Sequence, residues 1–155
     1  MTKLSVEVDP DRLRQADGRT QLALRWYERA QAIDSLDDRY LALWIALEAL
    51  AGGPGTDLLK RLWELVVVAL GEPTSRNPQM IATARDRVDV RSLRDLRNRI
   101  IVGTGRELAP SNVEFTVSSS TLATVDAVVE DTLRRRLSLP PSRSLVRAIE
   151  APPRQ

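Results

Sequence analysis

The chain of 155 residues contains neither cysteine nor histidine. Without cysteine it forms no disulfide and offers no thiolate to a metal, and without histidine it lacks the commonest metal ligand. The same two absences exclude histidine- and cysteine-based catalysis within one chain. We therefore expect no metal site and no bound cofactor, and an enzymatic activity has to use other side chains.

Aromatic residues and long apolar runs are also scarce. Three Trp, two Tyr and one Phe are too few to predict stacking platforms for single-stranded bases. The longest apolar run, 40–47, is too short to span a bilayer, and the N-terminus lacks the apolar run of a signal peptide. We expect a cytoplasmic protein with no membrane partner.

The composition that is present is typical of a folded globular domain. Hydrophobic residues make up 43% and charged residues 28%, and the chain is long enough for one domain with a core. A net charge of +2 is too small to drive nucleic-acid binding by itself. Basic residues gather in the second half, where residues 81–155 carry 13 basic and 9 acidic side chains. Nearly all basic residues are arginine, which fits either a biased genome or a phosphate site.

Hydrophobic periodicity predicts an all-α fold with five or six helices. The expected helices cover residues 19–33, 38–51, 57–70, 78–88 and 90–102, and a last long helix runs from the serines at 118–120 to 137. The second of them is apolar nearly all round, which is typical of the central helix of a bundle. Alternating residues at 4–8 and 112–117 indicate short extended segments.

The same pattern divides the chain into three parts. Residues 1–18 are expected to form an N-terminal arm, and residues 19–137 a helical domain. Residues 138–155 are expected to form a mobile, proline-rich tail, in which 144–151 has the length of two helical turns.

Glu48 is the exception in the apolar helix 38–51. It continues the apolar stripe of that helix, where a carboxylate has to be paired or costs several kcal/mol, roughly. We expect Arg97 or Asn98 from another helix as its partner. The alternative is that Glu48 reaches solvent at the helix end, because Gly52 follows so soon.

The segment 93–103, LRDLRNRIIVG, is the most informative part of the chain. As a helix it has an apolar stripe made of Leu93, Leu96 and Ile100. At about 100° per residue, Asn98 and Val102 lie on the opposite face. A valine on that polar face indicates a surface that something else covers, or else a solvated face with one stray apolar residue.

Two segments resemble signature helices of Apea-like HEPN domains, the higher eukaryotes and prokaryotes nucleotide-binding group. The segment 40–50, YLALWIALEAL, resembles the second helix of that family, and 93–103 resembles its motif helix. The resemblance covers about residues 20–137. It implies an HEPN-like helical bundle that forms a homodimer through the motif helix. In many members the dimer cleft cuts single-stranded RNA without a metal, often in defence or stress response.

The resemblance also assigns roles to residues. Arg97 is implied as the phosphate-binding arginine, Asn98 as its neighbour and Glu48 as the acid that orients them. Val102 stands where the family has its catalytic histidine. The arginines clustered around the motif are candidate nucleic-acid contacts: Arg91, Arg94, Arg99 and Arg106.

Three hypotheses follow for the function. The first is a catalytically degenerate dimer that binds RNA, a nucleotide or a protein partner through an arginine-lined cleft. The second is a ribonuclease of that family, because acid–base catalysis near neutral pH suits imidazole. It is either inactivated at Val102, by natural loss or by a silencing replacement, or uses another acid–base group. The third is a structural protein-interaction module. As it stands, the chain is expected to be inactive as a nuclease.

Overall fold

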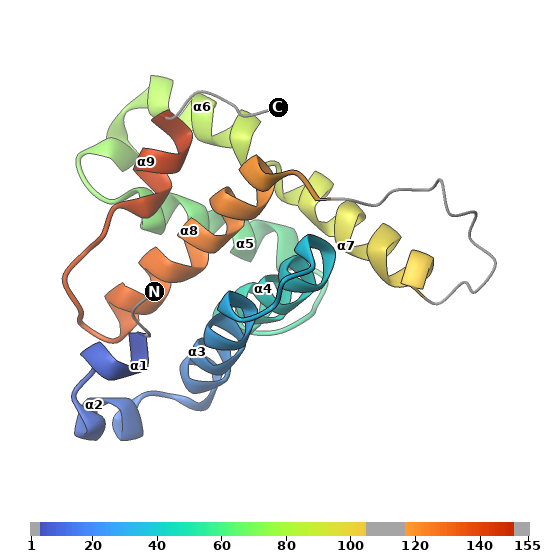
Figure 1. Cartoon of the computed structure of the whole chain (residues 1–155). Helices are drawn as coiled ribbons and strands as arrows, with labels where there is room; N and C mark the ends of the chain where they lie inside the picture. Colours follow the sequence, from blue (N-terminus) through green and yellow to red (C-terminus); the bar gives the residue numbers. More distant parts are fainter. Residues whose placement is uncertain (1–3, 105–116, 151–155) are drawn as a thin grey trace.

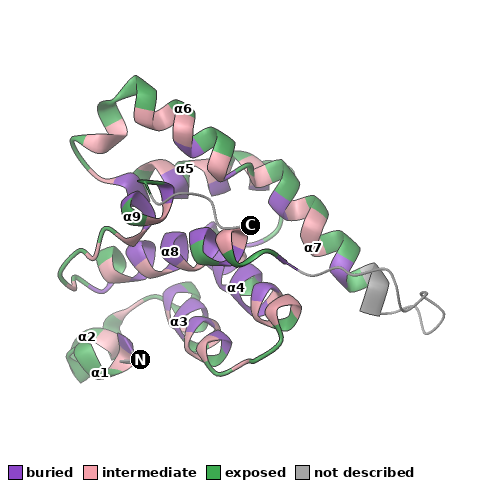
Figure 2. Ribbon diagram, turned by 45° about the horizontal axis from the view of Figure 1, so that its top comes forward, coloured by how far each residue is buried: buried purple, intermediate pink, exposed green. Residues whose placement is uncertain are grey.

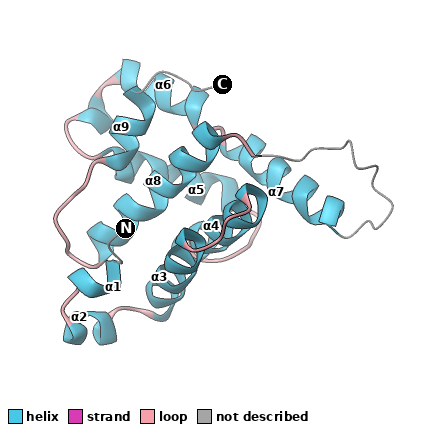
Figure 3. Ribbon diagram, viewed as in Figure 1, coloured by secondary structure: helices cyan, strands magenta, loops and turns pink. Residues whose placement is uncertain are grey.

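A computed structural model describes residues 4–104 and 117–150, and these ranges are largely helical without a strand (Figures 1 and 3). The elements are α1 (Leu4–Glu7), α2 (Pro10–Gln15), α3 (Gly18–Gln31), α4 (Leu36–Leu50), α5 (Leu58–Leu70), a 3-10 turn (Thr74–Arg76), α6 (Pro78–Arg87), α7 (Val90–Thr104), α8 (Ser119–Arg136) and α9 (Ser144–Glu150). The all-α prediction is confirmed, and α3 to α8 correspond to the expected helices. Within the described ranges, no helix has the length and apolar character needed to cross a membrane.

Helix α4 lies at the centre of the bundle, as its sequence predicts. It packs along α3 and against α8, and α8 in turn contacts α5 and α9. Buried residues, purple in Figure 2, are concentrated on α4 and α8. They include Tyr40, Leu43 and Trp44 from α4 and Val129 and Leu133 from α8. Each large apolar side chain removed from water stabilises the fold by about 1.5–3 kcal/mol. The buried residues of α4 and α8 are therefore a major part of the hydrophobic core.

The C-terminus of α4 is closed by two glycines in left-handed conformations. Gly52 has φ +97° and Gly53 has φ +93°. The Gly53 N–H donates to the Glu48 carbonyl at 2.8 Å, which is the long hydrogen bond of a Schellman motif. Arg136 of α8 donates to the Leu50 carbonyl at 2.6 Å. These contacts end α4 and tie its end to α8.

The N-terminal segment differs from the sequence prediction. Residues 4–7 form α1 and not an extended strand, so that prediction was wrong. Leu4 and Val8 are both buried, because residues four apart lie on one face of a helix as well as on one face of a strand. Helix α1 contacts α3, and the expected arm 1–18 is therefore folded onto the bundle from residue 4.

The C-terminal segment also differs from the expected mobile tail. Helix α9 forms over Ser144–Glu150, close to the predicted two turns, and packs against α8. Its side chains Leu145, Val146 and Ile149 are buried. Because these apolar groups enter the core, residues 144–150 belong to the folded domain.

Candidate functional site

The candidate motif helix is α7, whose C-terminal end extends beyond the rest of the bundle (Figure 1). Leu93 and Ile100 are buried and Leu96 is half-buried, so the predicted apolar stripe is confirmed. The hydroxyl of Tyr40 in α4 donates to the Leu93 carbonyl at 2.6 Å. Burial raises the pKa of Tyr40 far above its usual value, which keeps this hydroxyl protonated as a donor.

Asp89 caps the N-terminus of α7. Its Oδ1 accepts from the N–H groups of Arg91 at 3.1 Å and Ser92 at 3.3 Å, and its Oδ2 accepts from the Ser92 hydroxyl at 2.8 Å. These hydrogen bonds, the Ser92 hydroxyl first, lower the pKa of the Asp89 carboxyl. The charged form is therefore the one that stabilises the start of the helix.

Replacing Asp89 by alanine is expected to lower the free energy of unfolding by about 1 kcal/mol at pH 7, because two N–H groups lose their acceptor. Since folding lowers the pKa of this carboxyl, its contribution is present above the unfolded pKa of about 3.9 and is lost as the pH falls through the folded value. Urea unfolding of both proteins at pH 7 and at pH 3 measures the difference.

The control for this prediction is Asp89→Asn, which keeps an acceptor oxygen but cannot ionise. It is expected to stay close to the natural chain at pH 7, because asparagine caps helices about as well as aspartate. A destabilisation of the alanine variant that is the same at both pH values would contradict an ionised cap.

Arg97 and Asn98 form a side-chain pair on the surface of α7. The Arg97 Nη1 donates to the Asn98 Oδ1 at 2.8 Å. Arg97 is half-buried at the edge of the apolar stripe, and Asn98 is exposed. The amide therefore orients one side of the guanidinium, and the remaining N–H groups of that guanidinium can meet an anion.

Helix α7 is a cationic surface. It carries one aspartate and four arginines, a net charge of +3, and the arginines are Arg91, Arg94, Arg97 and Arg99. Among the described residues, none of the four forms an ion pair with a carboxylate. By contrast, Arg134 of α8 lies between Glu7 and Glu130, with N···O distances of 3.1 Å to each. The charges of the four α7 arginines are thus not balanced by a carboxylate within the described ranges.

Among the described residues, neither Arg97 nor Asn98 forms the predicted pair with Glu48. Glu48 is half-buried, and no hydrogen bond or ion pair joins its carboxylate to a described residue. The amide oxygen of Asn98 accepts from Arg97 instead. A half-exposed carboxylate near the end of α4 fits the alternative that Glu48 reaches solvent.

Two other predicted residues lie at or beyond the limit of the described structure. The backbone of Val102 is part of α7, one turn after Asn98, but its side chain lies outside the described residues. Arg106 also lies outside them. Arg91, Arg94, Arg97, Asn98 and Arg99 are thus the predicted site residues that one described helix brings together.

The chemistry that these side chains offer is anion binding. Arginine presents fixed N–H groups that match phosphate oxygens. Across residues 4–104 and 117–150 there is no group of three or more acidic side chains that could hold a metal ion. An arginine-rich helix with one aspartate lacks a group that gives and takes a proton near pH 7.

The comparisons with known proteins give no family. No protein-family model matches the chain, and no curated protein or solved structure is significantly similar to it. We therefore infer a function from the arginines of α7 and from the resemblance of the segments 40–50 and 93–103 to HEPN helices.

Proposed function

We propose that the chain is an HEPN-like module that binds single-stranded RNA through α7 without cleaving it. The observation that carries the proposal is the Arg97–Asn98 pair on a protruding helix of net charge +3, whose arginines have no described carboxylate partner. Arginines that the fold does not use are available to neutralise phosphates.

Phosphate contacts fit this helix better than base recognition. Each arginine that neutralises a phosphate releases counterions, so affinity for the backbone accumulates along the helix and falls as salt is added. With few aromatic residues in the chain, stacking on bases contributes little. The proposed binding is therefore sensitive to salt and largely independent of sequence.

The absence of histidine supports binding without cleavage. Cleavage through the ribose 2′-hydroxyl needs a proton taken and given near neutral pH, and Val102 stands where the HEPN resemblance places the histidine. General acid–base catalysis contributes about 10²- to 10⁴-fold per group. Arginines alone stabilise charge but do not move the protons.

The proposed binding unit is a homodimer that packs through α7. Ile101 lies on α7 next to the arginine face with 44% of its surface exposed, so a dimer that packs through α7 would bury one apolar side chain from each copy. Two copies of α7 would then bring two Arg97 side chains to one cleft. That pairing doubles the charge that meets the RNA.

The test is fluorescence anisotropy with a labelled single-stranded RNA, on the natural chain and on the double variant Arg94→Gln/Arg97→Gln. Each charged hydrogen bond that the variant removes is worth about 1.5–3 kcal/mol, so the affinity is expected to fall at least about tenfold per arginine. The slope of log K against log salt is expected to become shallower by about 0.7 for each phosphate of the single strand that is no longer neutralised.

The matched control is Arg12→Gln/Arg25→Gln, which removes the same charge from exposed positions on α2 and α3. An equal decrease in affinity in the two double variants would refute a site on α7. Light scattering on the same samples gives the oligomeric state. A stable dimer without RNA affinity at low salt would favour the protein-interaction module instead.

A further inference from the structure

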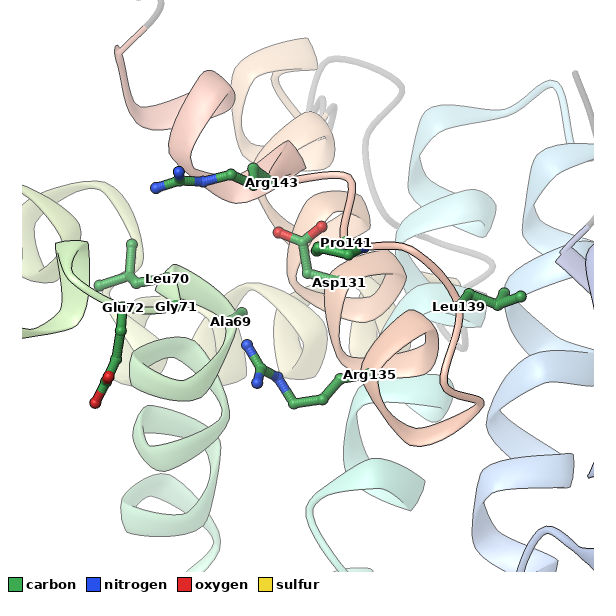
Figure 4. Close-up of a pocket in the computed structure, with 9 residues that line it drawn as sticks. All are labelled: Ala69, Leu70, Gly71, Glu72, Asp131, Arg135, Leu139, Pro141 and Arg143. Carbon is green, nitrogen blue, oxygen red and sulfur yellow. The ribbon is translucent and has the colours of Figure 1, made fainter.

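A cavity of about 490 Å³ lies between the end of α5, helix α8 and the α8–α9 connection (Figure 4). Its lining includes Ala69, Leu70, Gly71, Arg135, Pro141 and Arg143. A volume of this size suits a small metabolite. No residue of α7 lines this cavity, so its chemistry is independent of the function proposed above.

The acidic side chains of this cavity already have partners. The Asp131 carboxylate accepts from the Ser142 hydroxyl at 2.7 Å and from the backbone N–H groups of Ser144 at 3.0 Å and Leu145 at 2.9 Å. Glu72 forms an ion pair with Arg76, at 2.8 Å. The charge of Glu72 is thus paired with Arg76, whereas Asp131 keeps its negative charge because all three of its donors are neutral.

The two arginines of the cavity are each held by one neutral contact. Arg135 Nη2 donates to the Val68 carbonyl at 3.1 Å, and Arg143 Nη2 donates to the Thr74 hydroxyl at 2.8 Å. Neither guanidinium forms an ion pair within the described ranges. Figure 4 shows both side chains extending from the α8–α9 side toward the end of α5. Two guanidiniums thus line one cavity with most of their N–H donors available, and the Asp131 carboxylate in the same lining offsets part of their charge.

The backbone holds this arrangement in place. Ser138 has φ +55° and Arg143 has φ +54°, left-handed conformations that cost a residue with a side chain about 1 kcal/mol or more. The N–H of Leu139 donates to the Arg134 carbonyl at 2.8 Å, which closes the end of α8 as a Schellman motif. The α8–α9 connection is therefore a preformed wall of the cavity.

We propose that this cavity binds a small phosphomonoester. The three terminal oxygens of a phosphate can accept hydrogen bonds from two guanidiniums at once, whereas the two oxygens of a carboxylate suit one. The phosphate lies between Arg135 and Arg143, and the organic part of the ligand packs on apolar lining such as Leu70 and Pro141.

The test uses phenyl phosphate as the probe and isothermal titration calorimetry as the measurement. Binding to the natural chain is expected, and Arg135→Gln and Arg143→Gln are each expected to raise the dissociation constant at least about tenfold. The control is Arg147→Gln, an exposed arginine of α9 that does not line the cavity, and it is expected to bind as the natural chain does. Benzoate, with one charge, is expected to bind at least about tenfold more weakly.

Several results would overturn this proposal. They are the absence of phenyl phosphate binding at millimolar concentration, an equally weakened affinity in Arg147→Gln, and benzoate binding as tightly as phenyl phosphate. NMR amide chemical shifts of the natural chain, followed during titration with phenyl phosphate, locate the binding site even if a variant fails to fold. Titration is expected to move the signals of Gly71 and Arg143, and shifts confined to α7 would place the anion elsewhere.

Discussion

A histidine in place of Val102 is expected to give the chain metal-independent cleavage of single-stranded RNA, at a rate about 10²- to 10⁴-fold above that of the natural chain. The substitution supplies an imidazole, whose pKa of about 6.5 suits proton transfer near neutral pH. It lies one turn after Asn98, on the same face of α7, and in the proposed dimer the HEPN resemblance implies that this position and Arg97 of both copies line one cleft. A labelled RNA incubated with EDTA and resolved on a gel measures the rate.

Two control variants separate this expectation from a general effect of adding histidine. Gln79→His adds the same imidazole at an exposed position of α6, away from α7, and is expected to leave the RNA intact. Val102→His combined with Arg97→Ala is expected to lose most of the gained activity. The proposal of an HEPN-like scaffold fails if Val102→His dimerises and binds RNA but does not cleave it, or if Gln79→His cleaves equally well.

Most of the helical fold could be predicted because its long segments have an unambiguous period. The apolar stripe of α7 and the all-round apolar α4 give both the type and the approximate ends of those helices. The short segment 4–8 was predicted wrongly because Leu4 and Val8 satisfy either period. Helix α9 was recognised as two possible turns, but its burial against α8 depends on tertiary packing, which local composition does not report.

Site residues on one helix could be grouped from the sequence, whereas contacts between different helices could not. The side chains of one helix keep their relative positions whatever the fold, so the sequence already places Arg91, Arg94, Arg97, Asn98 and Arg99 on one helix, α7. Whether Glu48 meets Arg97 depends on how α4 and α7 are rotated against each other, and periodicity does not fix that rotation. The cavity of Arg135 and Arg143 was missed because it is formed by the turn between α8 and α9 and by the distant end of α5.

Replacing Asp131 by alanine is expected to lower the free energy of unfolding by about 2–4 kcal/mol. This carboxylate is 8% exposed and accepts three hydrogen bonds from the connection and first turn of α9. Its removal leaves the Ser142 hydroxyl and two backbone N–H groups without their acceptor, and each unsatisfied buried group costs about 1–3 kcal/mol before relaxation. Urea unfolding followed by circular dichroism measures the change, and hydrogen exchange is expected to show faster opening of α9.

Asp131→Asn is the informative control, because it keeps Oδ1 as an acceptor and replaces only Oδ2 by an NH₂ group. The amide oxygen still accepts from Ser142 and Ser144, while the new NH₂ group faces the Leu145 N–H, a donor against a donor. A stability between those of the natural chain and the alanine variant is therefore expected. Glu150→Gln, on the exposed end of α9, is expected to leave stability unchanged. If alanine and asparagine both unfold like the natural chain, apolar packing alone holds α9 against α8, and the buried carboxylate contributes nothing to that contact.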